Sequence, residues 1–123
     1  MLTVRVGVKD LDREVKFYEA LGFEVERRQH GANVLRGEAS FSIEHYEEFR
    51  VRDGALLDWE QRPSQLGTGV QLYVIVPNVD EVAANIPVGI PRPWPVQDKP
   101  WGLRELTLKT PSGYLLTFAQ RRR

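Results

Sequence analysis

The stretch WGLRELTLKTPSGYLLTF, residues 101–118, decides the fold class. In its first half polar and apolar residues alternate with a period of two, which is typical of a half-buried strand. The segment TPSG at residues 110–113 then favours a turn, since proline presets φ and glycine permits a positive φ. The apolar run at residues 114–119 indicates the returning strand. The sequence therefore predicts a β-hairpin here.

Upstream of this hairpin, the chain predicts two similar series of elements. The first series is a strand, a helix and three strands, at residues 2–8, 11–21, 23–26, 32–35 and 40–46. The helix is expected to begin at a cap, Asp10 or Asp12, and to end at Gly22. The second series opens with a strand over 70–76 and a short helix over 79–86. The proline-rich segment 87–100 should then form an edge or an extended loop, because proline cannot donate to a β-ladder.

Two segments of the first half are echoed in the second. Residues 6–12, VGVKDLD, match residues 74–80, VIVPNVD, at an offset of 74 − 6 = 68. Residues 42–45 match residues 115–118 at an offset of 115 − 42 = 73. Two echoes at nearly one offset indicate a duplicated unit. We therefore predict a single domain with one module at about 1–50, a second at about 70–123, and a connection over 51–69.

The composition excludes several classes of function. Lysine plus arginine and aspartate plus glutamate balance at 17 each, which removes the electrostatic case for binding nucleic acid or an anionic membrane surface. The chain has no cysteine, so disulfides, thiolate metal sites and a cysteine nucleophile are excluded. No apolar run is long enough to span a bilayer. We expect a cytoplasmic protein.

The motifs resemble one known family. The Trp-Gly-x-Arg opening of the hairpin, the strand-DLD-helix-Leu-Gly-Phe pattern at the start and the internal echo are similar to the glyoxalase/bleomycin-resistance family, also called the vicinal-oxygen-chelate superfamily. The resemblance implies an α+β fold in which two βαβββ modules form a curved open cup. It also implies a homodimer that binds a small molecule.

Metal-dependent members of this family place ligands on the first and last strands of each module. Carried over to this chain, those positions fall on Thr3, Glu44, Gln71 and Thr117. Threonine hydroxyls are poor replacements for imidazole and carboxylate donors, and the two histidines of the chain fall on none of the positions. We therefore expect no metal, no other cofactor and no catalytic residue.

Alternation along the strands predicts which side chains line the cup. The candidate ligand-binding residues on strands are Arg5, Glu44, Tyr46, Gln71, Tyr73, Arg104 and Thr117. Arg104 is expected to pair with Glu44 or with a ligand anion, or else to point outward beside a strand end. Trp59, Trp94 and Trp101 are candidates for stacking on a flat or cationic ligand, and the alternative for each is a packing role.

Three functions remain open on this sequence. The first is sequestration of a drug or an aromatic or cationic metabolite by a metal-free homodimer, as in the bleomycin-resistance proteins that confer antibiotic resistance. The second is a lyase or dioxygenase with an atypical metal site, using Glu44 and Gln71 as ligands or Glu44 as a general base. The third is an interaction module that uses only its dimer surface.

Overall fold

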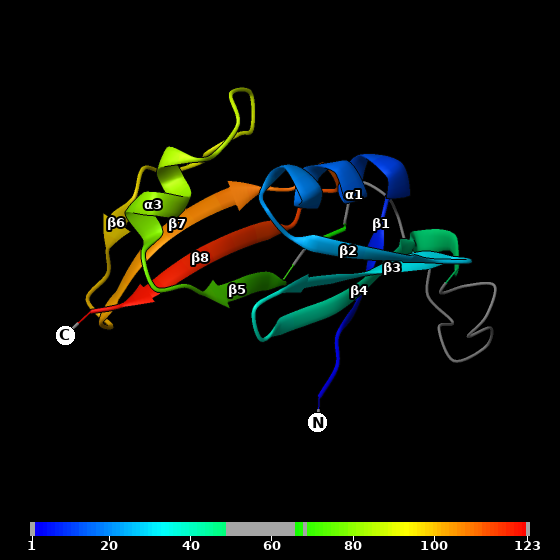
Figure 1. The fold of residues 1–123 in the computed structure, drawn as a ribbon, viewed down its shortest axis with the longest axis horizontal. Coiled ribbons are helices and arrows are strands. Elements are labelled where there is room, and N and C mark those ends of the chain that lie inside the picture. The colour runs from blue at the N-terminus through cyan, green and yellow to red at the C-terminus, as the bar shows by residue number, and fades with distance from the viewer. Residues whose placement is uncertain (1, 49–65, 68, 123) are drawn as a thin grey trace.

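Each half of the chain folds as a strand, a helix and three strands. The computed structural model describes residues 2–48, 66–67 and 69–122, so most of the predicted connection and Trp59 lie outside the described residues. The first module contains β1 (Arg5–Val8), α1 (Leu11–Ala20), β2 (Glu24–Arg28), β3 (Gly31–Arg36) and β4 (Ala39–His45). The second contains β5 (Gln71–Ile75), α3 (Val79–Ala84), β6 (Gln97–Asp98), β7 (Leu103–Lys109) and β8 (Leu115–Arg121). The predicted α+β fold of two βαβββ modules is confirmed, and the modules lie side by side (Figure 1).

The two modules have the same sheet topology. The strand order is β1-β4-β3-β2 in the first sheet and β5-β8-β7-β6 in the second, and in each sheet the first strand runs parallel to the last. The register pairs Val6 with Ile43 and Val74 with Phe118. The last strands therefore correspond at an offset of 118 − 43 = 75, two residues more than the sequence echo suggested.

Equivalent residues begin the two helices. Asp10 caps α1 by accepting a hydrogen bond from the backbone N–H of Arg13 at 3.2 Å, and Asn78 caps α3 by accepting one from Glu81 at 3.1 Å. Such a cap stabilises a helix by about 1 kcal/mol. Asp10 and Asn78 are 68 residues apart, so the first sequence echo marks truly equivalent positions. No helix in the described part of the chain is long and apolar enough to cross a membrane.

The helix-bearing faces of both sheets share one apolar core. In the first module Tyr18 of α1 is fully buried and packs edge-on against Phe23 and Phe41. Phe23 also contacts Phe118 of β8, with ring centroids 6.0 Å apart. The guanidinium of Arg36 lies 5.5 Å from the centre of the same Phe118 ring. These contacts join the modules on the side of the sheets where the helices pack.

The tip of the β7–β8 hairpin is tied to the first module by hydrogen bonds. Ser112 Oγ accepts the backbone N–H of Lys9 at 2.8 Å, and the Tyr114 hydroxyl donates to the carbonyl oxygen of Gly7 at 2.7 Å. Burial raises the pKa of Tyr114 to about 12, which keeps this donor protonated. The turn at residues 110–113 and the tyrosine that follows it thus bond the second module to the first.

The proline-rich segment 87–100 follows the second helix, as expected. Its only strand is the two-residue β6, which forms the edge of the second sheet beside β7. Upstream of β6, Arg92 Nη2 donates to the carbonyl oxygen of Ala83 in α3 at 2.7 Å. The carbonyl oxygen of Pro91 accepts the N–H of Lys109 at 3.3 Å. The segment is therefore held against α3 and the end of β7.

A buried carboxyl group lies beneath the hairpin tip. Glu14 of α1 is fully buried, and neither of its carboxyl oxygens is placed to accept a hydrogen bond. Burial raises its pKa, and the proximity of Ser112 and Thr110 opposes this shift only in part. A raised pKa in the folded state means that Glu14 disfavours folding once the pH exceeds the pKa of the unfolded chain, about 4.3.

We predict that Glu14→Gln changes the pH dependence of stability. Below the unfolded pKa the carboxyl group is protonated in both states, so the variant gains nothing there from the missing charge. As the pH rises from the unfolded pKa to the folded pKa, Glu14→Gln should gain stability relative to the wild type, up to about 1.4 kcal/mol for each unit by which the pKa is raised. Urea unfolding from pH 4 to pH 8 measures this, and a pH-independent difference between the two proteins would contradict it.

Candidate functional site

Polar side chains gather on the face of each sheet that is turned away from its helix, here called the helix-free face. Alternation in β4 points Ile43 into the core and Glu44 to the helix-free face. In β7, Leu106 likewise points into the core, while Glu105 and Thr107 point the other way. Both glutamates are almost completely buried, Glu44 with 2% and Glu105 with 4% of its surface exposed. Two acidic groups are therefore withdrawn from water on these faces.

The position of Glu44 depends on the glycines beside it. In the first sheet Glu44 is paired with Gly7 on one side and with Gly31 on the other, and Gly31 is paired with Arg28 of β2. A Cβ atom on Gly31 would overlap the backbone of Ile43 and lie 2.7 Å from Glu44 Cγ. Without that atom, Arg28 Nη2 approaches Glu44 Oε1 to 3.6 Å across β3. A cation of the chain itself thus offsets the charge of Glu44.

Glu105 is held by neutral donors instead. The Tyr73 hydroxyl donates to Oε1 at 3.3 Å and the Trp101 indole Nε1 donates to Oε2 at 2.8 Å. Within the described residues no lysine or arginine forms an ion pair with Glu105. Burial raises the pKa of the Tyr73 hydroxyl, and the negative charge of Glu105 and the hydrogen bond to it raise it further. Among the described residues, the carboxylate is therefore fixed in position by two neutral donors.

The two glutamates occupy the same level of the two modules. Gly7 and Ile75 are equivalent at the 68-residue offset, and they are paired with Glu44 and Ala119 respectively. On the next strand, Gly31 lies opposite Glu44, and Glu105 lies opposite Ala119. Each module thus pairs one glutamate with one small residue. The glutamate lies on the last strand of the first module and on the third strand of the second.

Gln71 and Thr117, both predicted site residues, are brought together on the second sheet. Gln71 Nε2 donates to Thr117 Oγ1 at 2.8 Å, and Thr117 Oγ1 lies 2.9 Å from Thr107 Oγ1. Both threonines are buried. This chain of hydrogen bonds links the two threonine hydroxyls to each other and to the amide of Gln71, so it forms the floor of the face beside Glu105.

The four positions implied for metal ligands do not form a set. Glu44 corresponds by register to Ala119 and not to Thr117, so the implied pattern is shifted in the second module. Thr117 is engaged with Gln71, and Glu44 faces Arg28. In the described part of the chain, no three histidine, cysteine, aspartate or glutamate side chains lie close enough together to hold a metal ion. These residues therefore do not fit a divalent metal of the kind that the family uses.

The prediction that Arg104 pairs with Glu44 is wrong. Arg104 bonds to Asp80 of α3 through Nη2 and to Asp98 of β6 through Nη1, each at 2.9 Å. The reason is alternation, since Arg104 shares a face of β7 with Leu106 and so points to the helix side of the sheet. Arg104 lies near the start of β7, as the alternative expected, but it is held by these two carboxylates.

The remaining candidates lie apart from Glu105. Arg5 begins β1 on the same face as Glu44, whereas Tyr46 follows β4 and packs partly against the core. Trp94 is 47% exposed and lies in the loop that is held to α3. In the described part of the chain it makes no hydrogen bond to Glu105. Trp101 is 60% exposed even though its Nε1 is bonded. The structure therefore joins Trp101 and Tyr73 into one site and leaves Trp94 outside it.

Sequence analysis missed Glu105, although a signal for it was present. The alternation in residues 103–109 places Glu105 and Thr107 on the polar face of β7. Glu105 is therefore an acidic residue on a polar strand face, as Glu44 is, and it lies two residues from Thr107 and four from Trp101. Glu105 lies on the third strand of its module, whereas the positions implied for metal ligands lie on the first and last strands.

Known structures share this fold. TioX from Micromonospora sp. ML1 matches with a TM-score of 0.68 and 24% identity, over 100% of this chain and 97% of that one. A glyoxalase/bleomycin resistance protein/dioxygenase family enzyme from Burkholderia phytofirmans PsJN matches with a TM-score of 0.74 and 15% identity, over 97% and 96%. The bleomycin resistance determinant encoded on transposon Tn5 matches with a TM-score of 0.67 and 19% identity, over 100% and 98%. No protein-family model and no curated protein matches the chain.

These matches are structural, and they establish the fold. The chain has the glyoxalase/bleomycin-resistance fold, so the resemblance seen in the sequence is confirmed at this level. Proteins with this fold include both a drug-resistance determinant and a family enzyme. The fold alone does not choose between them, and the side chains of the site must do so.

We predict that Glu105→Gln lowers the pKa of Tyr73. The substitution removes the negative charge that raises this pKa, while the burial of the hydroxyl is unchanged. Ultraviolet titration of tyrosinate measures the shift, with Tyr73→Phe used to assign the transition. Glu26→Gln, on the exposed strand β2, is the matched control and should leave the titration as in the wild type. An unchanged Tyr73 transition in Glu105→Gln would show that the carboxylate does not bond to this hydroxyl.

Proposed function

We propose that the chain belongs to the glyoxalase/bleomycin-resistance family and binds a small cationic aromatic molecule by sequestration, without chemistry. The observation that carries the proposal is Glu105, a buried carboxylate bonded by Tyr73 and Trp101. A fixed negative charge beside exposed aromatic rings is suited to a flat cation, through a charge-assisted hydrogen bond and a cation–π contact. The match to the Tn5 bleomycin resistance determinant supports the same class of ligand.

Lys99 supports the cationic character of the ligand. Its ammonium lies 5.6 Å from the centre of the Trp101 ring and donates to Gln97 Oε1 at 2.7 Å. The environment of Trp101 therefore already accepts a positive charge that belongs to the chain. A ligand with its own cation beside an aromatic ring would use the same combination of ring and carboxylate.

The proposal includes a homodimer in the cytoplasm. Tyr73 and Ile75 on the edge strand β5 expose 44% and 53% of their surfaces, and Trp101 is exposed on the same helix-free face. An edge strand with exposed apolar side chains is normally covered by a partner. A second copy placed over this face would turn an open sheet surface into an enclosed cleft around Glu105.

Bleomycin is the probe that tests the proposal. Titration of the purified protein should quench tryptophan fluorescence saturably without added divalent metal. Glu105→Gln should weaken binding by about tenfold or more, since a hydrogen bond to a charged group contributes roughly 1.5–3 kcal/mol. Glu26→Gln should bind as the wild type does. A flat titration, or binding that requires a metal, would overturn sequestration of this kind and favour an enzyme or an interaction module.

Two tryptophan variants separate the proposed site from other aromatic surfaces. Trp101→Ala should weaken bleomycin binding by roughly threefold to thirtyfold, the range expected for the loss of a cation–π contact of about 0.5–2 kcal/mol. Trp94→Ala, in the loop beside α3, is the matched control and should bind normally. Isothermal titration calorimetry is the measurement, because it does not depend on the tryptophans as reporters. The reverse order of effects would move the site to the proline-rich segment.

A further inference from the structure

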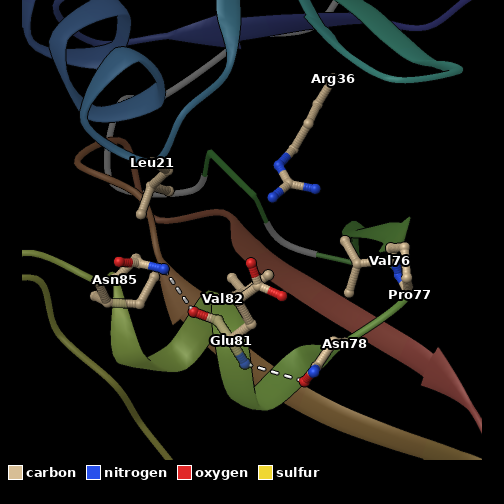
Figure 2. A pocket seen from close by; sticks show the side chains of 9 residues that line it. Leu21, Arg36, Val76, Pro77, Asn78, Glu81, Val82 and Asn85 are labelled. Atoms are coloured by element: carbon tan, nitrogen blue, oxygen red, sulfur yellow. Dashed lines mark hydrogen bonds between the residues drawn. The ribbon is translucent and has the colours of Figure 1, made fainter.

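A second pocket lies between the modules, on the side of the sheets where the helices pack. Its volume is about 240 Å³. The first module contributes Leu21, which follows α1, and Arg36, the last residue of β3. The second module contributes residues of the β5–α3 connection and of α3. Its polar lining consists of Arg36, Asn78, Glu81 and Asn85 (Figure 2). The pocket is separate from Glu105, which is on the opposite face of the second sheet.

Two opposite charges face each other across this pocket. The Arg36 guanidinium enters from β3 and the Glu81 carboxylate rises from α3, and the two groups point toward one another (Figure 2). The two groups, both in the described part of the chain, do not form an ion pair. The Arg36 guanidinium instead lies over the Phe118 ring. A cation and an anion that are held apart in one cavity leave room for a ligand bearing both charges.

Two asparagines also line the pocket, and each has one polar atom engaged in α3. Asn78 uses its Oδ1 to cap α3, which leaves its Nδ2 as a free donor. Asn85 uses its Nδ2 to bond the carbonyl oxygen of Glu81 at 2.9 Å, which leaves its Oδ1 as a free acceptor. The two asparagines thus add one donor and one acceptor to the lining of the pocket. Both asparagines are fixed by their helix contacts, so the groups are preorganised.

The remaining wall is apolar, and the pocket is small. The side chains of Leu21, Val76, Val82 and Ile86 line it between the polar groups. Its volume is below the roughly 300 Å³ at which pockets for drug-sized ligands begin, so the occupant is a small metabolite. We infer that the pocket binds a free zwitterionic α-amino acid with an apolar side chain. Its carboxylate meets Arg36, its ammonium meets Glu81, and its side chain lies on the apolar wall.

This site does not depend on the proposed drug-binding function. It uses none of the residues around Glu105, and it spans the junction of the modules. A ligand here would bridge Arg36 of the first module to Glu81 of the second, so it should raise the thermal unfolding temperature of the protein. A direct Arg36–Glu81 contact in the free protein would be a solvent-accessible ion pair, which contributes little and is readily displaced.

L-Leucine is the probe for this inference. In ¹⁵N-labelled full-length protein, L-leucine at concentrations on the order of 1 mM should shift the side-chain signals of Arg36 Nε, Asn78 and Asn85 saturably. Isoamylamine and isocaproate carry the same hydrocarbon with only one of the two charges, and each should bind at least about tenfold more weakly. Equal binding of either analogue would show that the pocket does not recognise a zwitterion.

Charge-removing variants complete the test. Arg36→Met and Glu81→Gln should each weaken L-leucine binding by about tenfold or more. Glu38→Gln, in the adjacent β3–β4 turn and outside the pocket, is the matched control and should bind as the wild type does. Glu105→Gln should also bind L-leucine normally, which separates this result from the bleomycin titration. Absence of saturable shifts in the folded wild type, or binding that survives both pocket substitutions, would overturn the inference.

Discussion

Each module buries a glutamate on its helix-free face because the residue opposite is too small to fill the space. Gly31 leaves room for Glu44, and Ala119 lies across from Glu105. A buried carboxylate must be paired or bonded, since an isolated buried charge is strongly unfavourable. The first module meets this requirement with Arg28, and the second with two neutral donors. The two carboxylates therefore differ in their partners, since among the described residues only Glu44 has a cationic one.

The hairpin that holds Glu105 also fixes the relation between the modules. Its strands carry Glu105 and Phe118 on opposite faces of the second sheet, and its turn is bonded to the end of β1. The helix-free face of the second module therefore depends on the hairpin, whereas the residues that line the inter-module pocket lie outside it. Loosening the turn should disturb this face, whereas changes at either glutamate or at Arg36 should remain local.

Much of the fold could be predicted from the sequence, because local chemistry specifies it. The turn at 110–113, the cap at Asp10 and the alternation in β7 each act within a few residues, and the internal echo revealed the duplication. The site was harder, because it depends on register across strands. A two-residue difference in the last-strand offset separated Glu44 from Thr117, and the bonding of Glu105 to Tyr73 joins residues 32 apart.

The central claim is that Glu105 anchors a cationic ligand on the helix-free face of the second module. A crystal structure of the protein with bleomycin tests it most directly. The account predicts a positively charged group of the drug bonded to the Glu105 carboxylate, with an aromatic part of the drug against Trp101 or Tyr73. A drug molecule bound elsewhere on the protein, or crystals grown at saturating drug that contain none, would contradict the account.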